Sequence, residues 1–157
     1  IDACLVGSEM CIRDRAEGAR KSGRDSKECE LLWGGFIATG ETEEDLKTAK
    51  RNVAARISFY ASTRTYRPAL EFHGWEDVNE ALHKLSIEGK WEEMFSLVTD
   101  EMVETLGFCG TGEEVANALK DNLGPICSAA MWNEVEHLGA DHSRDDHVSN
   151  LIQIAKG

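Results

Sequence analysis

The stretch from Leu31 to Trp75 constrains the fold of this chain more than any other. It contains, in order, an apolar run, a tight turn, a long amphipathic segment, and an aromatic segment that also carries arginines. The run LLWGGFIA lacks the alternation of a half-buried strand, so we expect a strand over Glu30–Thr39 that is buried on both faces. Gly34 and Gly35 predict a bulge or a close backbone approach within it. A strand followed by a turn and a helix indicates an α/β protein.

The helix predicted from Thr42 to Tyr60 has the clearest signals. Thr42 is the predicted N-cap, and Asp45 stands three residues later, as in a capping box. Apolar residues then recur at spacings of 3, 4 and 4, which places them on one face of a helix. They are Leu46, Ala49, Val53 and Ile57.

Similar patterns predict the remaining elements. We expect a short helix that ends near Gly74, a helix over residues 75–89, and one or two helices over residues 90–106. Thr111 and Glu114 form a capping box for a helix that Gly124 ends, and ordinary capping is favoured over anion binding there because Glu113 and Glu114 repel anions. A short extended piece precedes it at Phe108–Cys109. A second buried strand is expected over Pro125–Trp132, and a terminal helix over Val148–Lys156.

Composition excludes several classes of function. The 29 acidic and 17 basic residues give a formal net charge of −12, which argues against partners such as nucleic acid and anionic membranes. No apolar run approaches the ~20 residues that span a bilayer, and no signal peptide is visible, so a cytoplasmic location is expected. The five scattered cysteines form no CxxC pair, which argues against a disulfide scaffold.

The N-terminal residues 1–15 are expected to be foreign to the fold. The chain starts at Ile1, and its segment CLVGSEMCIRDR resembles a string that recurs where sequencing-adapter DNA has been translated in metagenomic data. We therefore treat residues 16–157 as the native portion and expect a longer parent protein.

Two groups of residues are candidates for sites. The segment Ser58–Trp75 holds aromatic residues with Arg64 and Arg67 among them, and such a segment either fills a core or lines a ligand pocket. The second group comprises imidazoles and carboxylates in residues 133–147. Their spacing matches no familiar metal site, so we expect a solvated acidic loop and no metal.

With these elements placed, the chain resembles the C-terminal part of the luciferase-like monooxygenase superfamily. It is most similar to the branch of deazaflavin-dependent oxidoreductases, which use coenzyme F420. The residues that carry the resemblance are SGRD (22–25), FIATGETEE (36–44), FYAST (59–63), YRP (66–68), HGW (73–75) and GTGEEVA (110–116).

The resemblance implies the last two β/α units of a (β/α)8 TIM barrel with a helical insertion, incomplete in this chain. The strand in the 30s would be barrel strand seven, and Pro125–Trp132 would be strand eight. A helical excursion would fill about 42–106. Active sites of such barrels lie at the C-terminal ends of the strands. Thr39, Gly40 and Trp132 would lie there, and the segment from Tyr60 to Trp75 would fold over the same face.

The resemblance further implies a flavin or deazaflavin cofactor and a small-molecule substrate, with a homo-oligomer left open. Coenzyme F420 is the first expectation and FMN the alternative. The residues expected to contact cofactor or substrate are Thr39, Gly40, Tyr60, Tyr66, Arg67, His73, Trp75 and Trp132. For two of them a structural role is weighed above the ligand role: Arg67 in an ion pair and His73 packed above Gly74. No catalytic residue is carried over, because those come from earlier strands, and the chain alone is expected to be inactive.

Two alternatives stay open from the sequence. One is an FMN-dependent monooxygenase of the same superfamily, since nothing in this part of the sequence separates the two cofactors. The other is a non-enzymatic helical interaction domain formed by residues 42–123. The predicted strands before and after that segment argue against the second alternative.

Overall fold

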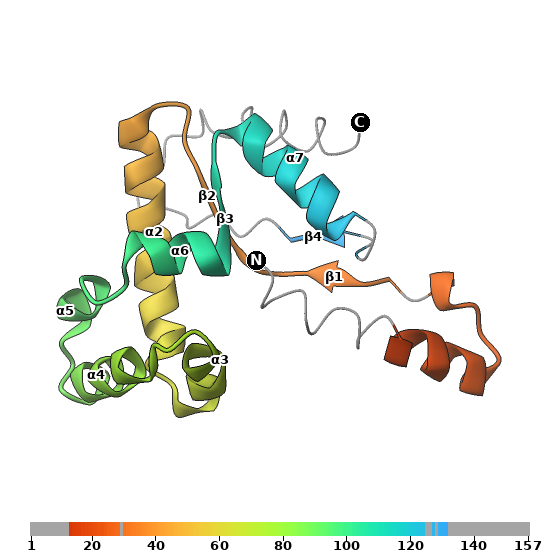
Figure 1. Ribbon diagram of the computed structural model, residues 1–157, viewed down its shortest axis with the longest axis horizontal. Helices are drawn as coiled ribbons and strands as arrows, with labels where there is room; N and C mark the ends of the chain where they lie inside the picture. The colour runs from red at the N-terminus through yellow and green to blue at the C-terminus, as the bar shows by residue number, and fades with distance from the viewer. Residues whose placement is uncertain (1–12, 29, 125–126, 128, 132–157) are drawn as a thin grey trace.

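The computed structural model describes residues 13–28, 30–124, 127 and 129–131. They form an α/β arrangement of short parallel strands and several helices (Figure 1). The strands are β1 (Leu32–Trp33), β2 (Phe36–Thr39), β3 (Gly107–Gly110) and β4 (Ala129–Ala130). β2 pairs with β3, and β1 pairs with β4. The expected α/β class is therefore confirmed, while the described residues contain no closed barrel.

The described part of the chain begins in a helix. Residues 13–22 are helical, Gly23 follows with φ of 68°, and a 3₁₀ turn covers η1 (Ser26–Glu28). Gly23 therefore takes the left-handed conformation expected of the residue after a helix. Residues 13–15 belong to this same helix, although they lie on the foreign side of the boundary predicted at residue 16.

The predicted strand over Glu30–Thr39 is divided into β1 and β2 by Gly34 and Gly35. A Cβ added to Gly35 would lie 2.1 Å from the Trp33 ring, so the ring lies over this backbone and would have to shift for any larger residue. The expected close approach is confirmed. Burial on both faces is not, because Leu32 is 58% exposed and only Ala38 of the two strands is fully buried.

Helix α2 (Glu43–Ala61) has the start that its sequence predicts. The Thr42 hydroxyl accepts a hydrogen bond from the Asp45 amide at 3.1 Å and donates one to the Asp45 carboxylate at 2.6 Å. Val53 and Ile57, from the predicted stripe, are buried. The helix is therefore fixed by a cap at one end and by its apolar face along its length.

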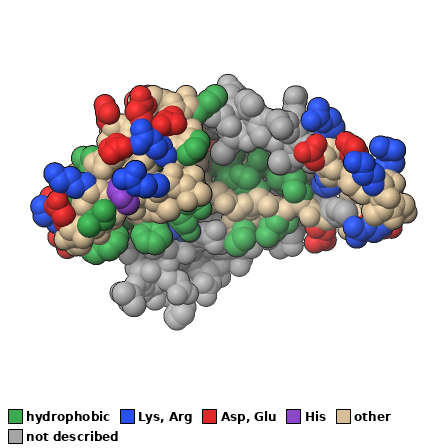
Figure 2. All heavy atoms as spheres, turned by 90° about the horizontal axis from the view of Figure 1, so that it is seen from below, with side chains coloured by type: hydrophobic (Ala, Val, Ile, Leu, Met, Phe, Trp, Pro, Cys, Tyr) green, Lys and Arg blue, Asp and Glu red, His purple; other side chains and the backbone are tan. Residues whose placement is uncertain are grey.

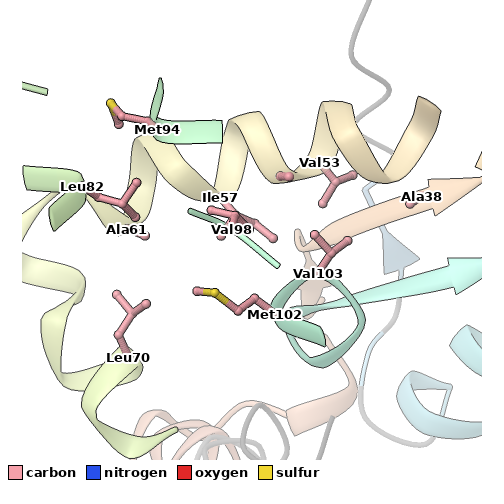
Figure 3. Packing of buried hydrophobic residues seen from close by; sticks show 11 residues of the cluster. Ala38, Val53, Ile57, Ala61, Leu70, Leu82, Met94, Val98, Met102 and Val103 are labelled. Atoms are coloured by element: carbon pink, nitrogen blue, oxygen red, sulfur yellow. The ribbon is translucent and has the colours of Figure 1, made fainter. Parts of the chain in front are cut away.

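Five shorter elements complete the helical part: η2 (Arg64–Tyr66), α3 (Arg67–Phe72), α4 (Glu76–Ile87), α5 (Trp91–Phe95) and α6 (Asp100–Leu106). Their apolar side chains pack with those of α2 around one core (Figure 3). Leu82, Met94, Met102 and Val103 are at most 1% exposed. The predicted helices over 75–89 and 90–106 are thus confirmed, the latter as two helices.

A buried amide joins two of these helices. Asn79 in α4 is 1% exposed, and its Nδ2 donates a hydrogen bond of 2.6 Å to the carbonyl of Ala61 at the end of α2. Carbonyls in the last turn of a helix have no partner within the helix. This one hydrogen bond therefore gives a partner both to a carbonyl at the C-terminal end of α2 and to the buried side-chain amide of Asn79.

The strand β3 corrects the topology predicted from the sequence. Phe108–Cys109 was expected as a short extended piece only, yet residues 107–110 pair in parallel with β2, from Phe36↔Gly107 to Thr39↔Gly110. The predicted succession from a strand in the 30s directly to a strand at 125–132 is therefore wrong. The helices α2–α6 form the crossover connection between two adjacent parallel strands, which such strands require.

The last part of the described chain packs on the other side of β3. Helix α7 (Gly112–Leu123) buries Val115 and Leu123 against Phe108, and the Phe108 ring meets the Trp33 ring edge-on at 5.3 Å. Figure 1 shows α7 and the α2–α6 helices on opposite sides of the β2–β3 pair. Two separate apolar clusters thus hold the strands.

For Ala129 and Ala130, the burial predicted for the strand over Pro125–Trp132 is wrong. Only Ala129 and Ala130 are extended within the described residues of this segment, both are exposed, and they pair with β1 rather than with β3. The predicted helix over Val148–Lys156 lies outside the described residues. Within the described ranges, no helix is both long and apolar enough to cross a membrane.

Candidate functional site

The direction of α2 separates the predicted site residues into two groups. A helix that follows a parallel strand runs back along it, and 19 residues at 1.5 Å each carry α2 about 28 Å. Figure 1 shows α2 descending from the turn after β2 to α3 at the far end. Thr39 and Gly40 therefore lie at the C-terminal end of β2, while Tyr60 lies near its start, with its ring 6.0 Å from that of Phe36.

The first group lies at the C-terminal ends of the paired strands β2 and β3. This pair of strand ends is called the strand edge below. Thr39 is opposite Gly110 in the register, and the Gly40 amide donates to the Gly110 carbonyl at 3.2 Å. A Cβ on Gly40 would lie 2.2 Å from the amide nitrogen of Leu46, so α2 begins directly against this glycine. The strand edge is thus a place of close backbone packing.

Carboxylates occupy the start of α7 beside this edge. The Thr111 amide donates to Glu114 Oε2 at 2.8 Å, and the Gly112 amide donates to Glu41 Oε1 at 3.4 Å. The hydrogen bond from the Thr111 backbone, followed by that from its hydroxyl, lowers the pKa of Glu114. The capping box predicted from Thr111 and Glu114 is confirmed. The contact of Glu41 was not predicted, because it joins residues 71 positions apart.

The second group lies around an open pocket of ≈370 Å³, here called the aromatic pocket. Three residues predicted for the site line it: Tyr60, Tyr66 and Trp75. The other lining residues were not predicted for a site: they are Gly34, Gly35, Phe36, Arg56, Ile57, Ala69, Leu70 and Leu106. Arg56 stands four residues before Tyr60 on α2, so helical spacing could have placed the two on one face.

Arg67 does not line this pocket. Its Nε lies 2.6 Å from Glu71 Oε1, and its Nη1 binds the carboxylate of Glu80. The hydrogen bonds with Glu71 and then Glu80 raise the pKa of Arg67. The guanidinium thus connects α3 to α4, which is the structural ion pair weighed against a ligand role for this residue.

His73 also lies outside the residues that line the pocket. Its ring stacks on the Trp75 ring at 4.6 Å with 19° between the planes, and the Phe72 ring meets it edge-on at 5.3 Å. Gly74 between them has φ of 74° and ends the helix. Packing above a glycine helix stop is therefore what the structure shows for His73.

The remaining predictions for sites concern Trp132 and the imidazoles and carboxylates of residues 133–147. Trp132 and residues 133–147 lie outside the described residues. In the part of the chain that the structure describes, no group of three or more His, Cys, Asp or Glu side chains could hold a metal ion.

An ion pair that the sequence did not indicate joins α2 to α6, close to Cys109 of β3. Lys50 Nζ is 2.5 Å from Glu104 Oε1, and this hydrogen bond raises the pKa of Lys50. Burial raises the pKa of the nearby Cys109 thiol to about 11. The thiolate is the nucleophilic form of cysteine, so this raised pKa keeps Cys109 almost entirely in the thiol form at neutral pH.

Comparisons with known proteins complete these observations. A sequence profile described as luciferase-like monooxygenase matches residues 5–124. The match includes residues 5–15, so it does not separate them from the rest of the chain. Uncharacterized proteins of Mycobacterium bovis and Mycobacterium tuberculosis are each 36% identical over 130 residues. The matched region covers 78% of this chain and 38% of each relative. No solved structure is significantly similar to the chain.

Proposed function

Because this chain belongs to the luciferase-like monooxygenase family, we propose that it is part of an oxidoreductase that transfers a hydride between coenzyme F420 and a small-molecule substrate. FMN is the alternative cofactor, with a monooxygenase reaction. The chain spans 38% of the length of the mycobacterial relatives, so the activity is proposed for the whole protein. The fragment alone is expected to be inactive.

The observation that carries this proposal, beside the family match, is the parallel pairing of β2 with β3. Parallel strands joined by helical crossovers are the repeating unit of a (β/α)8 barrel, and the reaction centre of such a barrel lies at the C-terminal strand ends. Thr39 and Gly40 stand at that end in this chain. We propose them, together with Trp132, as contacts for substrate or cofactor.

The strand edge does not fit the phosphate that both cofactors carry. The amides of the N-cap Thr111 and of Gly112, the first residue of α7, already donate to Glu114 and Glu41, and Glu113 adds a further carboxylate to the first turn. Negative charge at this helix start repels a phosphate. The phosphate is therefore assigned to another part of the whole protein, and no cofactor contact with α7 is proposed.

The experiment that tests the function uses the full-length protein that carries these residues. It is reconstituted separately with F420 and with FMN, and reduction of each is followed by the loss of its visible absorbance with candidate substrates. Reduction of F420 alone supports the first proposal, and reduction of FMN alone supports the alternative. Binding of neither cofactor contradicts both.

Variants of Arg67 and His73 test whether these residues have ligand roles beside their structural ones. Their contacts with Glu71, Glu80 and Trp75 favour structural roles, so Arg67→Met and His73→Gln are expected to leave substrate KM unchanged. A rise in KM with unchanged folding, judged by circular dichroism, would restore a ligand role.

A non-enzymatic helical interaction domain is disfavoured by β2 and β3, which lie at either end of the helical part and pair with each other. Far-ultraviolet circular dichroism without strand content would bring that alternative back.

A further inference from the structure

We propose that Glu41 is a positioning residue for the reaction centre at the strand edge. Its carboxylate joins the loop that follows β2 to the start of α7, and thereby keeps the backbone of Thr39 and Gly40 in place beside β3. The role concerns the geometry of the centre and assigns Glu41 no contact with substrate or cofactor. This inference rests on the oxidoreductase function proposed above.

The contact of Glu41 lies where the two paired strands separate. Thr39 and Gly110 face each other in the register, and the Gly40 amide donates to the Gly110 carbonyl at 3.2 Å. The chain after Gly40 then enters α2, and the chain after Gly110 enters α7. Glu41 is the next residue along the first of these chain segments, and its Oε1 accepts a hydrogen bond from the Gly112 amide at 3.4 Å. This side chain therefore extends the contact between the two segments one step past the strand pairing.

The two helices joined in this way pack in different apolar clusters. Ile57 of α2 belongs to the main cluster, whereas Val115 of α7 packs with Phe108 in the other. Figure 1 shows the two helices on opposite sides of the strand pair. A shift of α2 relative to α7 would displace the two strand ends relative to each other, and the hydrogen bond of Glu41 opposes such a shift.

The opposite end of β2 is held by apolar contacts. The Phe36 ring at the start of this strand lies 6.0 Å from the Tyr60 ring on α2. Figure 2 shows that hydrophobic side chains reach the surface of this helical part of the molecule. Apolar contacts are non-directional, whereas a hydrogen bond has a preferred distance and angle. Glu41 therefore restrains the backbone more narrowly at the end where the reaction centre is proposed.

Each of the two loops is already fixed to its own helix. A Cβ on Gly40 would lie 2.2 Å from the Leu46 amide nitrogen, and a Cβ on Gly110 would lie 2.7 Å from Glu114 Oε2. Loop and helix thus form one closely packed unit on each side of the strand edge. The hydrogen bond of Glu41 acts between these two units and fixes one relative to the other.

Ordinary helix capping does not account for the contact of Glu41. Thr42 caps α2, and the capping box of Thr111 and Glu114 pairs the amides of those two residues. Gly112 lies between them, is buried, and has one of the first amides of a helix, which lack a partner within the helix. A buried amide without a partner is costly, so this amide favours the acceptor that Glu41 brings from the other loop.

The test uses the full-length protein and the cofactor that it reduces. Glu41→Ala removes the acceptor, whereas Glu41→Gln keeps an oxygen that can accept from Gly112 and removes the charge. We expect Glu41→Ala to lower kcat about tenfold and to leave KM within about twofold, because a misplaced centre loses rate rather than binding. Glu41→Gln is expected to keep at least about half of kcat, since its oxygen preserves the hydrogen bond.

Glu44→Ala is the matched control. Glu44 is exposed in the first turn of α2, so this substitution removes a negative charge from the same helix start and keeps the hydrogen bond to Gly112. It is expected to retain the kcat of the unaltered protein. Urea unfolding of each variant shows whether the fold is intact.

Hydrogen exchange of the Gly112 amide, followed by NMR, reports the contact of Glu41 without any turnover. Exchange is expected to be about fivefold faster in Glu41→Ala, which corresponds to the loss of one hydrogen bond, and unchanged in Glu41→Gln.

The proposal is overturned if Glu41→Ala keeps the full kcat, or if exchange at Gly112 does not respond to this substitution. It is also overturned if Glu41→Gln or Glu44→Ala loses as much kcat as Glu41→Ala, because the effect would then come from charge. An unaltered protein that reduces neither cofactor contradicts the proposed function itself, and the role of Glu41 with it. That result is distinct, because it is obtained before any variant is compared.

Discussion

Gly40 shows how one residue fixes the junction between strand and helix. A Cβ at this position would lie 2.2 Å from the Leu46 nitrogen and 2.6 Å from the Asp45 carbonyl carbon, and backbone atoms cannot rotate away. We expect Gly40→Ala in the full-length protein to lower the free energy of unfolding by about 1–3 kcal/mol. Urea-induced unfolding of the variant and of the unaltered protein measures this difference in the free energy of unfolding.

Gly18 provides the matched control for this substitution. It lies in the helix of residues 13–22, and a Cβ there would meet nothing within 4 Å. Alanine has the higher helix propensity, so Gly18→Ala is expected to raise stability by about 0.5–1 kcal/mol. If Gly40→Ala and Gly18→Ala changed the free energy of unfolding equally, the backbone of α2 would not exclude a side chain at position 40.

Cys109 gives a prediction about pH. Burial raises the pKa of its thiol from the ordinary 9.0 to about 11, so the thiolate fraction at pH 8 falls about a hundredfold. We expect iodoacetamide to label Cys109 at least about a hundredfold more slowly in the folded protein than in urea, as measured by mass spectrometry. Similar rates would contradict the burial of this thiol.

The same shift has a consequence for stability. The folded state keeps a proton that the unfolded state releases above pH 9. Cys109 therefore contributes fully to the free energy of unfolding below that pH. This contribution is lost as pH rises from 9 toward about 11.

At the scale of the elements, the start of α7 depends on the ionised form of Glu114. Its pKa is lowered in the folded protein, so its contribution to stability is present above the ordinary pKa of glutamate and is lost as pH falls through the lowered value. We expect Glu114→Gln to destabilise the protein at pH 7 and to have little effect in acid. Urea unfolding at both pH values measures this.

Glu113→Gln is the control for that prediction. Glu113 is the neighbouring residue in the first turn of α7, is exposed, and belongs to the same helix start without taking part in the capping box. If Glu113→Gln lost as much stability as Glu114→Gln, the effect would come from the negative charge at the helix start and not from the hydrogen bonds of the capping box.

The helices were predictable from the sequence because their signals are local. Thr42 and Thr111 cap the helices they were expected to cap, and the stripe containing Val53 and Ile57 is buried. The strands were less predictable. The four residues of β3 carry two glycines, and their pairing with β2 depends on a partner 71 residues away. The predicted burial of Pro125–Trp132 failed for the same reason, since burial depends on what packs over a segment.

The candidate site was predicted in its residue types but not in its arrangement. Tyr60, Tyr66 and Trp75 do meet in one pocket, which the aromatic content of the segment indicated. The expectation that they fold over the same face as Thr39 and Gly40 is wrong, because α2 carries them back to the other end of β2. The charged partners of Arg67 were not predicted, since Glu80 belongs to the next helix.

At the scale of the whole molecule, the sheets that the described residues form have outer edges that no other described strand covers. The described residues form two sheets of two strands each, and each sheet has outer edges whose backbone groups can pair with another chain. We expect the isolated chain to self-associate, which sedimentation velocity would show as species larger than a monomer. A monodisperse monomer with one sharp, cooperative melting transition would contradict this.

The pairing of β2 with β3 also sets the order of events in folding. Phe36 and Gly107 are 71 residues apart, and closing so long a loop costs about 4 kcal/mol of chain entropy before any contact repays it. The helices between them contact one another locally, so they can assemble first and bring the two strands together. Stopped-flow kinetics are expected to show that Leu82→Ala slows folding, whereas Phe108→Ala chiefly speeds unfolding. The crossover would then act as the template on which the strands align.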